Sequence, residues 1–323
     1  MGIRLGVFFG GRSVEHEVSI ISAMQAIRAF DKTRYDITPI YIDKTGDMHA
    51  GTGLDAIENY RDIPALLARS RRVTLVRDSG RFFLQRHPAK RFSFEKGTEL
   101  DFAFPVVHGT TVEDGDLQGW FKTIGIPFAG CDVTASALGM DKYHMKAAFR
   151  ESGIPVLDGM RIRNRRFFED PDAAVKTIEA FSPYPVIVKP VNLGSSVGIR
   201  KASSAEELRD ALEYAFIFAN AALIERAVVD LREINCAVLG DEDEAVPSEC
   251  EEPITADAIL SYADKYGSGG KSGSGAKGMS SAKRKLPADI PPDTRRTIQD
   301  LAVRAFQTLG CNGVARVDFL LDR

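Results

Sequence analysis

The chain has 323 residues, of which 44% are hydrophobic and 27% are charged, a composition typical of a folded globular protein. One hydrophobic core rarely serves a chain of this length, so we expect two or three domains. The formal net charge of -3 gives no overall attraction to nucleic acids or anionic membranes, so we expect neither as a partner. The first residues lack the apolar length of a signal peptide, and no later stretch reaches about 18 apolar residues.

Four cysteines are scattered along the chain, without a Cys-x-x-Cys motif or a Cys/His cluster. This distribution argues against a disulfide framework and against a zinc site, and it favours reduced thiols. We therefore expect a cytoplasmic protein. The cysteines are Cys131, Cys236, Cys250 and Cys311.

The first third of the chain alternates predicted strands with a predicted helix, which favours an α/β domain with a parallel sheet. Buried strands are expected at residues 3–9, 35–42 and 102–107, because these runs are apolar and rich in β-branched or aromatic side chains. Residues 17–30 have helical spacing, and residues 73–84 suggest a hairpin around Asp78-Ser79-Gly80. Asp114 is expected to cap a helix that runs through Thr123.

The loop after the first strand reads GGRSVEHEVS and leads into a helix N-terminus, where the helix dipole favours anions. Glu17 sits where a carboxylate can cap a helix, and capping is as good an interpretation as a binding role. Glu15 precedes the helix and could instead point into a cleft, where it would hold a substrate ammonium. His108 ends the strand at 102–107, where α/β sheets bind ligands. A structural histidine is the more common alternative.

The second half begins with an expected helix over 134–152 and contains a further α/β section. Strands are predicted at 185–189, 222–226, 232–239 and 313–321, and helices at 205–219 and 292–309. Between them, KYGSGGKSGSGAKG cannot bury apolar surface and predicts a flap or linker within residues 255–285.

Lys189 ends a β-branched strand and is followed almost at once by a loop with Gly194, Ser195, Ser196 and Gly198. Glycines let backbone N–H groups converge on a phosphate, and serine hydroxyls add donors. The lysine precedes the glycines, so this is not the Gly-x-x-x-x-Gly-Lys-Ser/Thr loop. Taken alone, the stretch could also be an ordinary β-turn next to a chance lysine.

Two further strands end in or carry charged side chains. The run Leu223-Ile224-Glu225-Arg226, with Glu233 after it, could offer backbone groups to a base and a carboxylate to a ribose, although a surface strand is the simpler interpretation. Arg316 and Asp318 share one face of the last strand, because side chains alternate along a strand. They could form an internal salt bridge, or they could act as a stabiliser of negative charge and a Mg²⁺ ligand.

Taken together and in this order, seven segments resemble the D-alanine–D-alanine ligase family of ATP-grasp enzymes. The resemblance implies an α/β, ATP-grasp fold with an N-terminal substrate-binding domain at 1–140, a central domain at 141–233 and a C-terminal catalytic domain at 234–323. The segments are FFGGRSVEHEVS, HGTTVEDGDLQGWF, GIPFAGCDVTASALGMDK, VIVKPVNLGSSVGI, LIERAVVDLREI, SYADKY and GVARVDFLL.

The resemblance also implies the reaction and its cofactors. ATP would phosphorylate the carboxylate of one D-alanine, and the amine of a second would attack the acyl phosphate, giving a dipeptide for peptidoglycan synthesis. Lysines, an arginine and magnesium would bring the anions together. Two Mg²⁺ ions are implied, with Mn²⁺ as a substitute, and relatives suggest a homodimer.

Residue roles follow from the same resemblance. Glu15 would bind the first substrate's ammonium and form a hydrogen-bonded triad with Ser195 and Tyr266, while His108 would face the substrate carboxylate. Arg316 would stabilise the tetrahedral intermediate. The implied ATP and metal contacts are Lys142, Lys189, Lys265 and Ser196 at the phosphates, Glu225, Arg226 and Val228 at the adenine, Glu233 at the ribose and Asp318 at Mg²⁺.

The sequence departs from the family pattern at its end. In the family, the strand with the metal-binding aspartate leads into a Glu-x-Asn-x-x-Pro-Gly segment, whereas this sequence stops at Arg323. Glu233-Ile234-Asn235 has the Glu-x-Asn spacing, but it precedes Asp318 and lacks the Pro-Gly. We favour a ligase with an incomplete C-terminus. A D-alanine–D-serine ligase and an inactive ATP-binding remnant are the alternatives. Val112 replaces a usual glycine, which we expect to stiffen its loop.

Overall fold

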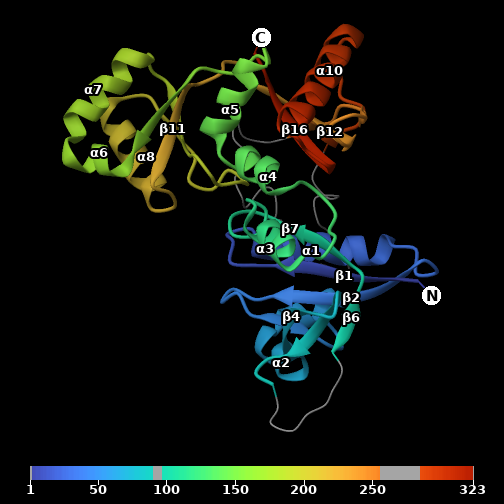
Figure 1. Cartoon of the computed structure of the whole chain (residues 1–323). Coiled ribbons are helices and arrows are strands. Elements are labelled where there is room, and N and C mark those ends of the chain that lie inside the picture. Colours follow the sequence, from blue (N-terminus) through green and yellow to red (C-terminus); the bar gives the residue numbers. More distant parts are fainter. Residues whose placement is uncertain (1, 90–96, 255–283, 323) are drawn as a thin grey trace. The chain divides into compact units, whose positions relative to one another are not determined.

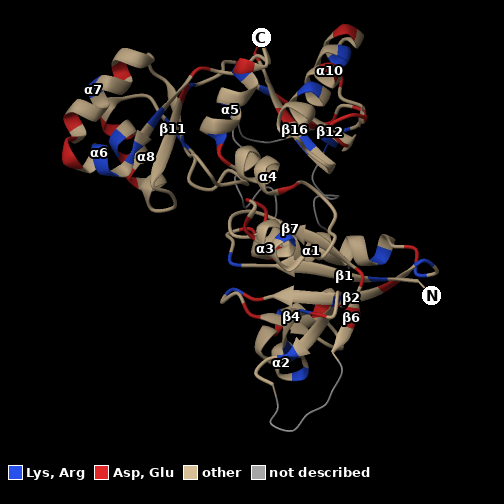
Figure 2. Ribbon diagram, in the orientation of Figure 1, with Lys and Arg blue, Asp and Glu red and all other residues tan. Residues whose placement is uncertain are grey.

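The computed structural model describes residues 2–89, 97–254 and 284–322. These residues form two compact units, one up to Val133 and the other from Thr134 onward. Acidic and basic residues are interspersed along the ribbon of both units, in keeping with the small net charge (Figure 2). None of the helices in the described ranges combines the length and apolar character needed to cross a bilayer.

The N-terminal unit contains a seven-stranded sheet in the order β6-β5-β4-β3-β2-β1-β7 (Figure 1). Only β1 with β2 and β1 with β7 pair in parallel, and the other neighbours are antiparallel. The expected parallel sheet is therefore confirmed for three strands, while the others pair antiparallel, as short connections allow. The strands are β1 (Ile3–Gly10), β2 (Tyr35–Ile42), β3 (Met48–Ala50), β4 (Arg71–Asp78), β5 (Arg81–Arg86), β6 (Thr98–Leu100) and β7 (Phe102–Val107).

Alternating side chains of β1 separate two hydrophobic clusters, as the twofold repeat of a strand requires. Val7 and Phe9 pack in the cluster that contains Met24 of α1, whereas Phe8 packs in the cluster that contains Phe121 of α3. The rings of Phe8 and Phe121 meet edge to face, with centroids 4.9 Å apart. The helical segments of this unit are α1 (His16–Ala29), η1 (Ile57–Arg61), α2 (Ile63–Arg69) and α3 (Asp116–Ile124).

The second unit contains a four-stranded antiparallel sheet in the order β10-β9-β11-β8. Val186 and Val188 of β9 and Ile224 of β11 are buried in one cluster with residues of the helices α7 and α8. The next residues along each strand therefore point to the opposite face. The elements are β8 (Gly159–Arg163), α6 (Asn164–Glu169), α7 (Pro171–Phe181), β9 (Val186–Pro190), β10 (Arg200–Ala202), α8 (Ala205–Phe216) and β11 (Ala221–Arg226).

The same unit includes a three-stranded antiparallel sheet in the order β13-β12-β16 and a small pair of strands, β14 and β15. β12 and β16 pair over nine positions, from Arg232 opposite Leu321 to Gly240 opposite Gly313. The elements are β12 (Arg232–Gly240), β13 (Ala245–Pro247), β14 (Glu252–Pro253), β15 (Arg284–Lys285), α10 (Pro292–Thr308) and β16 (Gly313–Leu321).

The single helix expected at 134–152 is wrong, because the structure has two helices, α4 (Val133–Met140) and α5 (Lys142–Glu151). Asp141 separates them: its backbone is extended, and its carboxylate accepts hydrogen bonds from the N–H groups of Tyr143 and His144. Aspartate is a strong helix N-cap, so α5 begins anew directly after it. As a consequence, Lys142 is the first residue of α5.

The expected helix cap at Asp114 is also wrong. The residue before α3 is Gly115, with a left-handed φ of +104°, and not Asp114. The Asp114 carboxylate accepts a hydrogen bond from the N–H of Thr111 at 2.8 Å and a longer one, at 3.5 Å, from the N–H of Asp116 at the start of α3. Glu17 lies in the first turn of α1 and forms an ion pair with Lys44 at 2.5 Å, while Glu15 occupies the cap position without a side-chain capping bond.

Candidate functional site

In the second unit, the loop after β9 turns back on the strand that carries Lys189. Ser195, Ser196 and Gly198 all have left-handed backbone conformations, with φ of +50°, +59° and +77°. A Cβ atom on Gly198 would lie 2.6 Å from Cγ of Pro190, so only glycine allows this close return. The fold therefore places the Gly/Ser loop beside the end of β9.

Lys142 is attached to the same loop. Its N–H donates to the carbonyl oxygen of Val191 at 2.8 Å, and its Nζ donates to the carbonyl oxygen of Leu193. Lys142 thus contacts the residues between Lys189 and Ser195. The structure brings two of the three predicted phosphate-binding lysines to one segment, and the third, Lys265, lies outside the described residues.

Lys189 and Glu225 share the face of the sheet opposite the helical core. In the register of β9 and β11, Leu223 lies opposite Lys189, and Glu225 is the next residue of β11 on that face. The Glu225 side chain is 1% exposed, and its two oxygens form ion pairs with Nζ of Lys189 and Nζ of Lys146. The prediction for Glu225 was a contact with adenine, whereas the structure pairs its carboxylate with two lysines.

Burial and neighbouring charges shift the pKa values of Glu225 and Lys146. Burial alone would raise the pKa of the Glu225 carboxyl, but Lys189 and Lys146 outweigh it and hold that pKa below its ordinary value. Burial lowers the pKa of the Lys146 ammonium despite its contact with Glu225. Lys146 was missed by the sequence reasoning. The available signal was its position four residues after Lys142, which places both on one face of a helix.

The remaining predicted nucleotide residues follow β11 or lie on β12. Arg226 ends β11, and its guanidinium pairs with the carboxylate of Asp322 at 2.6 Å. Val228 is half-buried in the connection after β11, and Glu233, also half-buried, lies opposite Leu320 of β16.

Arg316 and Asp318 lie on one face of β16, as predicted. Arg316 donates from Nε and Nη2 to the two carboxylate oxygens of Asp318, at 2.7 and 2.9 Å. Asp318 is opposite Asn235 of β12, so an amide oxygen and a carboxylate lie on the same side of the sheet. Within the described ranges no group of three His, Cys, Asp or Glu side chains forms a metal site. Asp318 and Asn235 offer oxygen ligands of the kind that Mg²⁺ prefers, and an ion held there would take its other ligands from phosphates and water.

In the N-terminal unit, the ends of β1 and β7 bring Glu15 close to the residue after His108. The Glu15 side chain is buried, and a Cβ atom on Gly109 would lie 2.9 Å from Glu15 Oε2 and 2.2 Å from Ser13 Oγ. Nε2 of His108 lies 3.0 Å from the hydroxyl of Ser22 on α1. The two predicted substrate residues of this unit thus lie at the carboxyl ends of neighbouring parallel strands, where such sheets bind ligands.

Val112 belongs to the same loop region and is buried. A Cβ atom on Gly11 would lie 2.5 Å from Cγ1 of Val112, so the valine packs directly on the glycine turn after β1.

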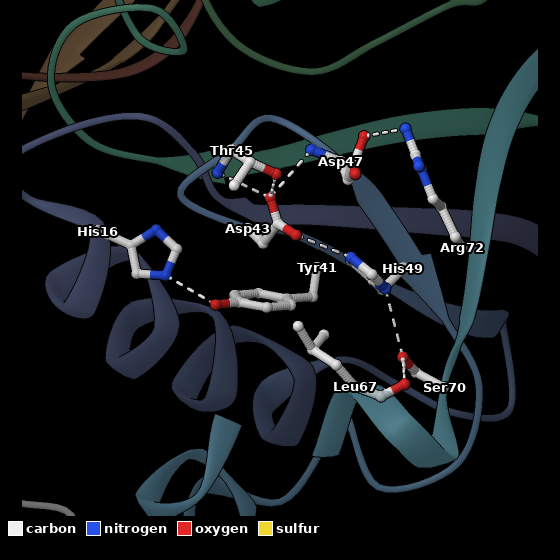
Figure 3. A network of polar contacts seen from close by, with 9 residues as sticks. All are labelled: His16, Tyr41, Asp43, Thr45, Asp47, His49, Leu67, Ser70 and Arg72. Carbon is white, nitrogen blue, oxygen red and sulfur yellow. Dashed lines mark hydrogen bonds and ion pairs between the residues drawn. The ribbon is translucent and has the colours of Figure 1, made fainter. Parts of the chain in front are cut away.

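A polar network that the sequence reasoning missed supports the loop that carries Glu15 (Figure 3). Nδ1 of the buried His16 lies 2.7 Å from the carbonyl oxygen of Gly11, and Nε2 lies 2.9 Å from the hydroxyl of Tyr41. Because a carbonyl only accepts, Nδ1 carries a proton, and in the neutral imidazole the Tyr41 hydroxyl donates to Nε2. Burial raises the pKa of the Tyr41 hydroxyl.

A second group of hydrogen bonds in the same region centres on Asp43, which lies next to His49. Asp43 Oδ2 lies 3.0 Å from Nε2 of His49, and Oδ1 accepts hydrogen bonds from the backbone and hydroxyl of Thr45 (Figure 3). Burial would raise the pKa of the Asp43 carboxyl, but the hydrogen bonds from Thr45 and His49 outweigh it and lower that pKa.

The predicted triad of Glu15, Ser195 and Tyr266 stays a prediction, because Tyr266 lies outside the described residues, as do Lys265 and most of the predicted flap.

Two protein-family models together match most of the chain. Residues 4–131 match the family model described as "D-ala D-ala ligase N-terminus", and residues 148–323 match "D-ala D-ala ligase C-terminus". A D-alanine–D-alanine ligase of Shouchella clausii is 38% identical to this chain, over 98% of this chain and 82% of the relative.

Two solved structures are similar over nearly the whole chain. The VanG D-Ala:D-Ser ligase of Enterococcus faecalis gives a TM-score of 0.79 at 31% identity, covering 100% of this chain and 87% of that one. The D-alanine–D-alanine ligase of Coxiella burnetii gives a TM-score of 0.81 at 27% identity, covering 99% of this chain and 81% of that one.

Proposed function

The chain belongs to the D-alanine–D-alanine ligase family, and from this premise we propose that it joins two D-alanine molecules at the expense of ATP. The carboxylate of the first D-alanine attacks the γ-phosphorus of ATP, which forms an acyl phosphate and releases ADP. The amine of the second D-alanine attacks the acyl carbon, phosphate leaves, and the nitrogen loses a proton. The product, D-alanyl-D-alanine, serves as a peptidoglycan precursor. Phosphorylation is needed because a carboxylate is a poor electrophile.

The observation that carries this proposal is the attachment of Lys142 to the segment between Lys189 and the Gly/Ser loop. The Lys142 ammonium lies against this segment, and Lys189 is on the strand that leads into it, so both lysines can supply positive charge to the polyphosphate of ATP, while the loop offers backbone and hydroxyl donors. Ser195 and Ser196 supply the hydroxyls, and Lys265 adds a third positive charge.

The first D-alanine is held in the N-terminal unit. Glu15 binds its ammonium, and His108 faces its carboxylate. Both side chains lie at the carboxyl ends of parallel strands, and the buried Glu15 carboxylate suits a small cationic group. Tyr266 completes a triad with Glu15 and Ser195.

The adenosine lies against the end of β11 and the start of β12. Arg226 and Val228 meet the adenine, together with the segment of Glu225, and Glu233 accepts a hydrogen bond from the ribose. This placement is supported by the change from a buried apolar strand to half-exposed residues after Arg226.

Arg316 and Asp318 act on the transferred phosphate and the tetrahedral intermediate. The guanidinium of Arg316 stabilises developing negative charge. Asp318, with Asn235 opposite it, holds a divalent metal that neutralises phosphate charge when bound. Two Mg²⁺ ions are proposed, with Mn²⁺ as a substitute.

We further propose the organisation of the working protein. Three domains, at 1–140, 141–233 and 234–323, hold ATP between the central and C-terminal ones, and two copies form a cytoplasmic homodimer. Light scattering after gel filtration measures the dimer, and a monomer mass at micromolar concentration would exclude it.

The reaction is tested by mass spectrometry of the dipeptide and by ADP release with D-alanine alone or with D-serine added. D-alanyl-D-alanine is the expected product. If D-alanyl-D-serine were the main product, the chain would be a D-alanine–D-serine ligase, as the VanG structure is named. ATP hydrolysis without any dipeptide would refute ligation. Calorimetry should show weaker ATP binding for Lys189→Ala and unchanged ATP binding for Glu15→Gln. Equal ATP affinity of the lysine variant and the wild type would contradict the phosphate assignment.

A further inference from the structure

Glu225 is shared by two lysines, of which only Lys189 has a role in the proposed reaction. Each carboxylate oxygen takes one ammonium: Oε1 pairs with Lys146 and Oε2 pairs with Lys189. The carboxylate is 1% exposed, and the lysine side chains are 15% and 16% exposed. Nζ of Lys146 also donates to the carbonyl oxygen of Leu157 at 3.1 Å, so this ammonium is held from two sides.

The three charges do not balance within the cluster. One carboxylate needs one ammonium for neutrality, and a second buried ammonium adds a desolvation cost. Such an arrangement persists when the extra charge has a use. One of the two ammonium groups belongs to Lys189, which is on the strand that leads into the Gly/Ser loop.

Lys189 cannot serve the carboxylate and a phosphate equally. When a triphosphate enters, the Lys189 ammonium turns toward the stronger anion, and Glu225 loses that partner. A buried carboxylate without a cation is costly, so this exchange would be opposed if Lys189 were the only neighbour. Lys146 removes that obstacle, because it stays on Glu225 through the exchange.

We propose that Lys146 is a positioning residue that neutralises Glu225 and so releases Lys189 for the nucleotide phosphates. This inference rests on the proposed function for the role of Lys189. Lys146 itself does not need to touch the nucleotide, and its effect on ATP passes through Glu225 and Lys189.

The proposal predicts a specific pattern in the ATP affinities of combined variants, measured by calorimetry without D-alanine. Lys146→Met should weaken ATP binding about tenfold, because Glu225 then retains Lys189. Lys146→Met added to Glu225→Gln should change the ATP affinity by less than about threefold, because the carboxylate charge that Lys146 neutralises is no longer present. In a Lys189→Met background, Lys146→Met should likewise have little further effect.

The contrary outcomes are distinct. If Lys146 contacts phosphate directly, Lys146→Met weakens ATP binding about tenfold in the Glu225→Gln background too, and the proposal is overturned. If Lys146 only supports the fold, its removal lowers the melting temperature equally in both backgrounds while ATP affinity is unchanged, which also overturns it.

The proposal can be tested even if Lys146→Met alone does not fold. Should Lys146→Met fail to fold, the double variant is compared with Glu225→Gln, because both lack the buried carboxylate charge. An ATP affinity within about threefold and an unchanged melting temperature support the proposal, whereas a loss of about tenfold in affinity or a lower melting temperature overturns it. Dipeptide synthesis is assayed on the same samples. If dipeptide synthesis is normal and the effects of the variants on ATP affinity are simply additive, the role of Lys146 is rejected while ligation stands. If the ATP affinities follow the expected pattern but no dipeptide forms, ligation is rejected while the role of Lys146 in nucleotide binding stands.

Discussion

The guanidinium of Arg316 and the carboxylate of Asp318 lie two residues apart on β16 and form a two-bonded ion pair, with distances of 2.7 and 2.9 Å. The side chains are 45% and 54% exposed, so water screens the pair and its contribution to stability is small, about 1 kcal/mol or less. A pair that contributes little to folding is available for other anions and cations. This availability suits a group that stabilises charge on a reacting phosphate and another that binds a metal.

Arg316→Ala should therefore separate catalysis from stability. Loss of one charge stabiliser is expected to lower kcat about a hundredfold or more, because the charge that develops in the transition state loses a donor. The melting temperature should change by no more than about 4 °C, since the exposed pair adds little. Steady-state kinetics and thermal unfolding measure the two effects. Arg316→Lys is the control and should recover part of kcat, and an unfolded Arg316→Ala protein would contradict the surface assignment.

Gly109→Ala should damage the pocket of Glu15 more than an equal change elsewhere. The new Cβ would lie 2.2 Å from Ser13 Oγ and 2.9 Å from Glu15 Oε2, at a residue with φ of +83°. We expect a loss of about 2–4 kcal/mol in the free energy of unfolding, from overpacking and backbone strain together. KM for D-alanine should rise while ATP affinity stays the same.

Gly80→Ala is the matched control for that change. Gly80 has a similar φ of +80°, but nothing lies within 4 Å of a Cβ atom built there. It should cost only the left-handed backbone strain of about 1–2 kcal/mol. Equal destabilisation of both variants, measured by urea unfolding, would show that the contact of Gly109 with Glu15 has no energetic weight.

Asp43 should make the stability of the N-terminal unit depend on pH in the acid range. Its pKa in the folded protein lies below the ordinary value of 3.8, because hydrogen bonds from Thr45 and His49 outweigh burial. The folded state therefore binds the proton less tightly than the unfolded state, and the stabilisation is present above pH 3.8. It is lost as the pH falls through the lower folded pKa.

The comparison with Asp43→Asn isolates this effect. At neutral pH the variant should be less stable by about 2 kcal/mol, because hydrogen bonds to a charged acceptor are lost. Urea unfolding from pH 7 to pH 3 should show the difference between wild type and variant shrinking toward acid. A difference that stays constant over this range would contradict the role of the Asp43 charge.

Local patterns in the sequence predicted the longer strands, because the deciding interactions are local, whereas shorter strands such as β3, β8 and β10 were not predicted. The bounds of β2, β7 and β16 agree with the expected ranges, since alternating or apolar runs end at turn residues. The shared face of Arg316 and Asp318 follows from strand geometry alone and is confirmed. The break at Asp141 was missed because the helical spacing continues across it, although aspartate before a new helix is a recognisable cap.

Features that depend on distant segments could not be predicted in the same way. The contact between Lys146 of α5 and Glu225 of β11 joins two residues that are 79 positions apart in the sequence. No periodicity encodes that pairing. The hydrogen bond between His16 and Tyr41 likewise depends on the parallel register of β1 and β2. Lys189 and the Gly/Ser loop were recognised from their local pattern, whereas the role of Lys142 came from the resemblance to a family.

The cysteines of the native protein should differ sharply in reactivity toward iodoacetamide. Cys131 is half-buried, whereas Cys236 and Cys250 are fully buried. Burial raises the pKa of the Cys236 thiol and raises that of Cys250 to about 11, so the reactive thiolate is scarce at both positions near neutral pH. Peptide mass spectrometry after brief labelling at pH 8 should find the label on Cys131 and not on this pair. The same reaction in 6–8 M urea (roughly the range that unfolds small domains) should label all three. Labelling of Cys250 at the rate of Cys131 without denaturant would show that the segment between β13 and β14 opens readily, and it would refute the buried environment assigned to this thiol.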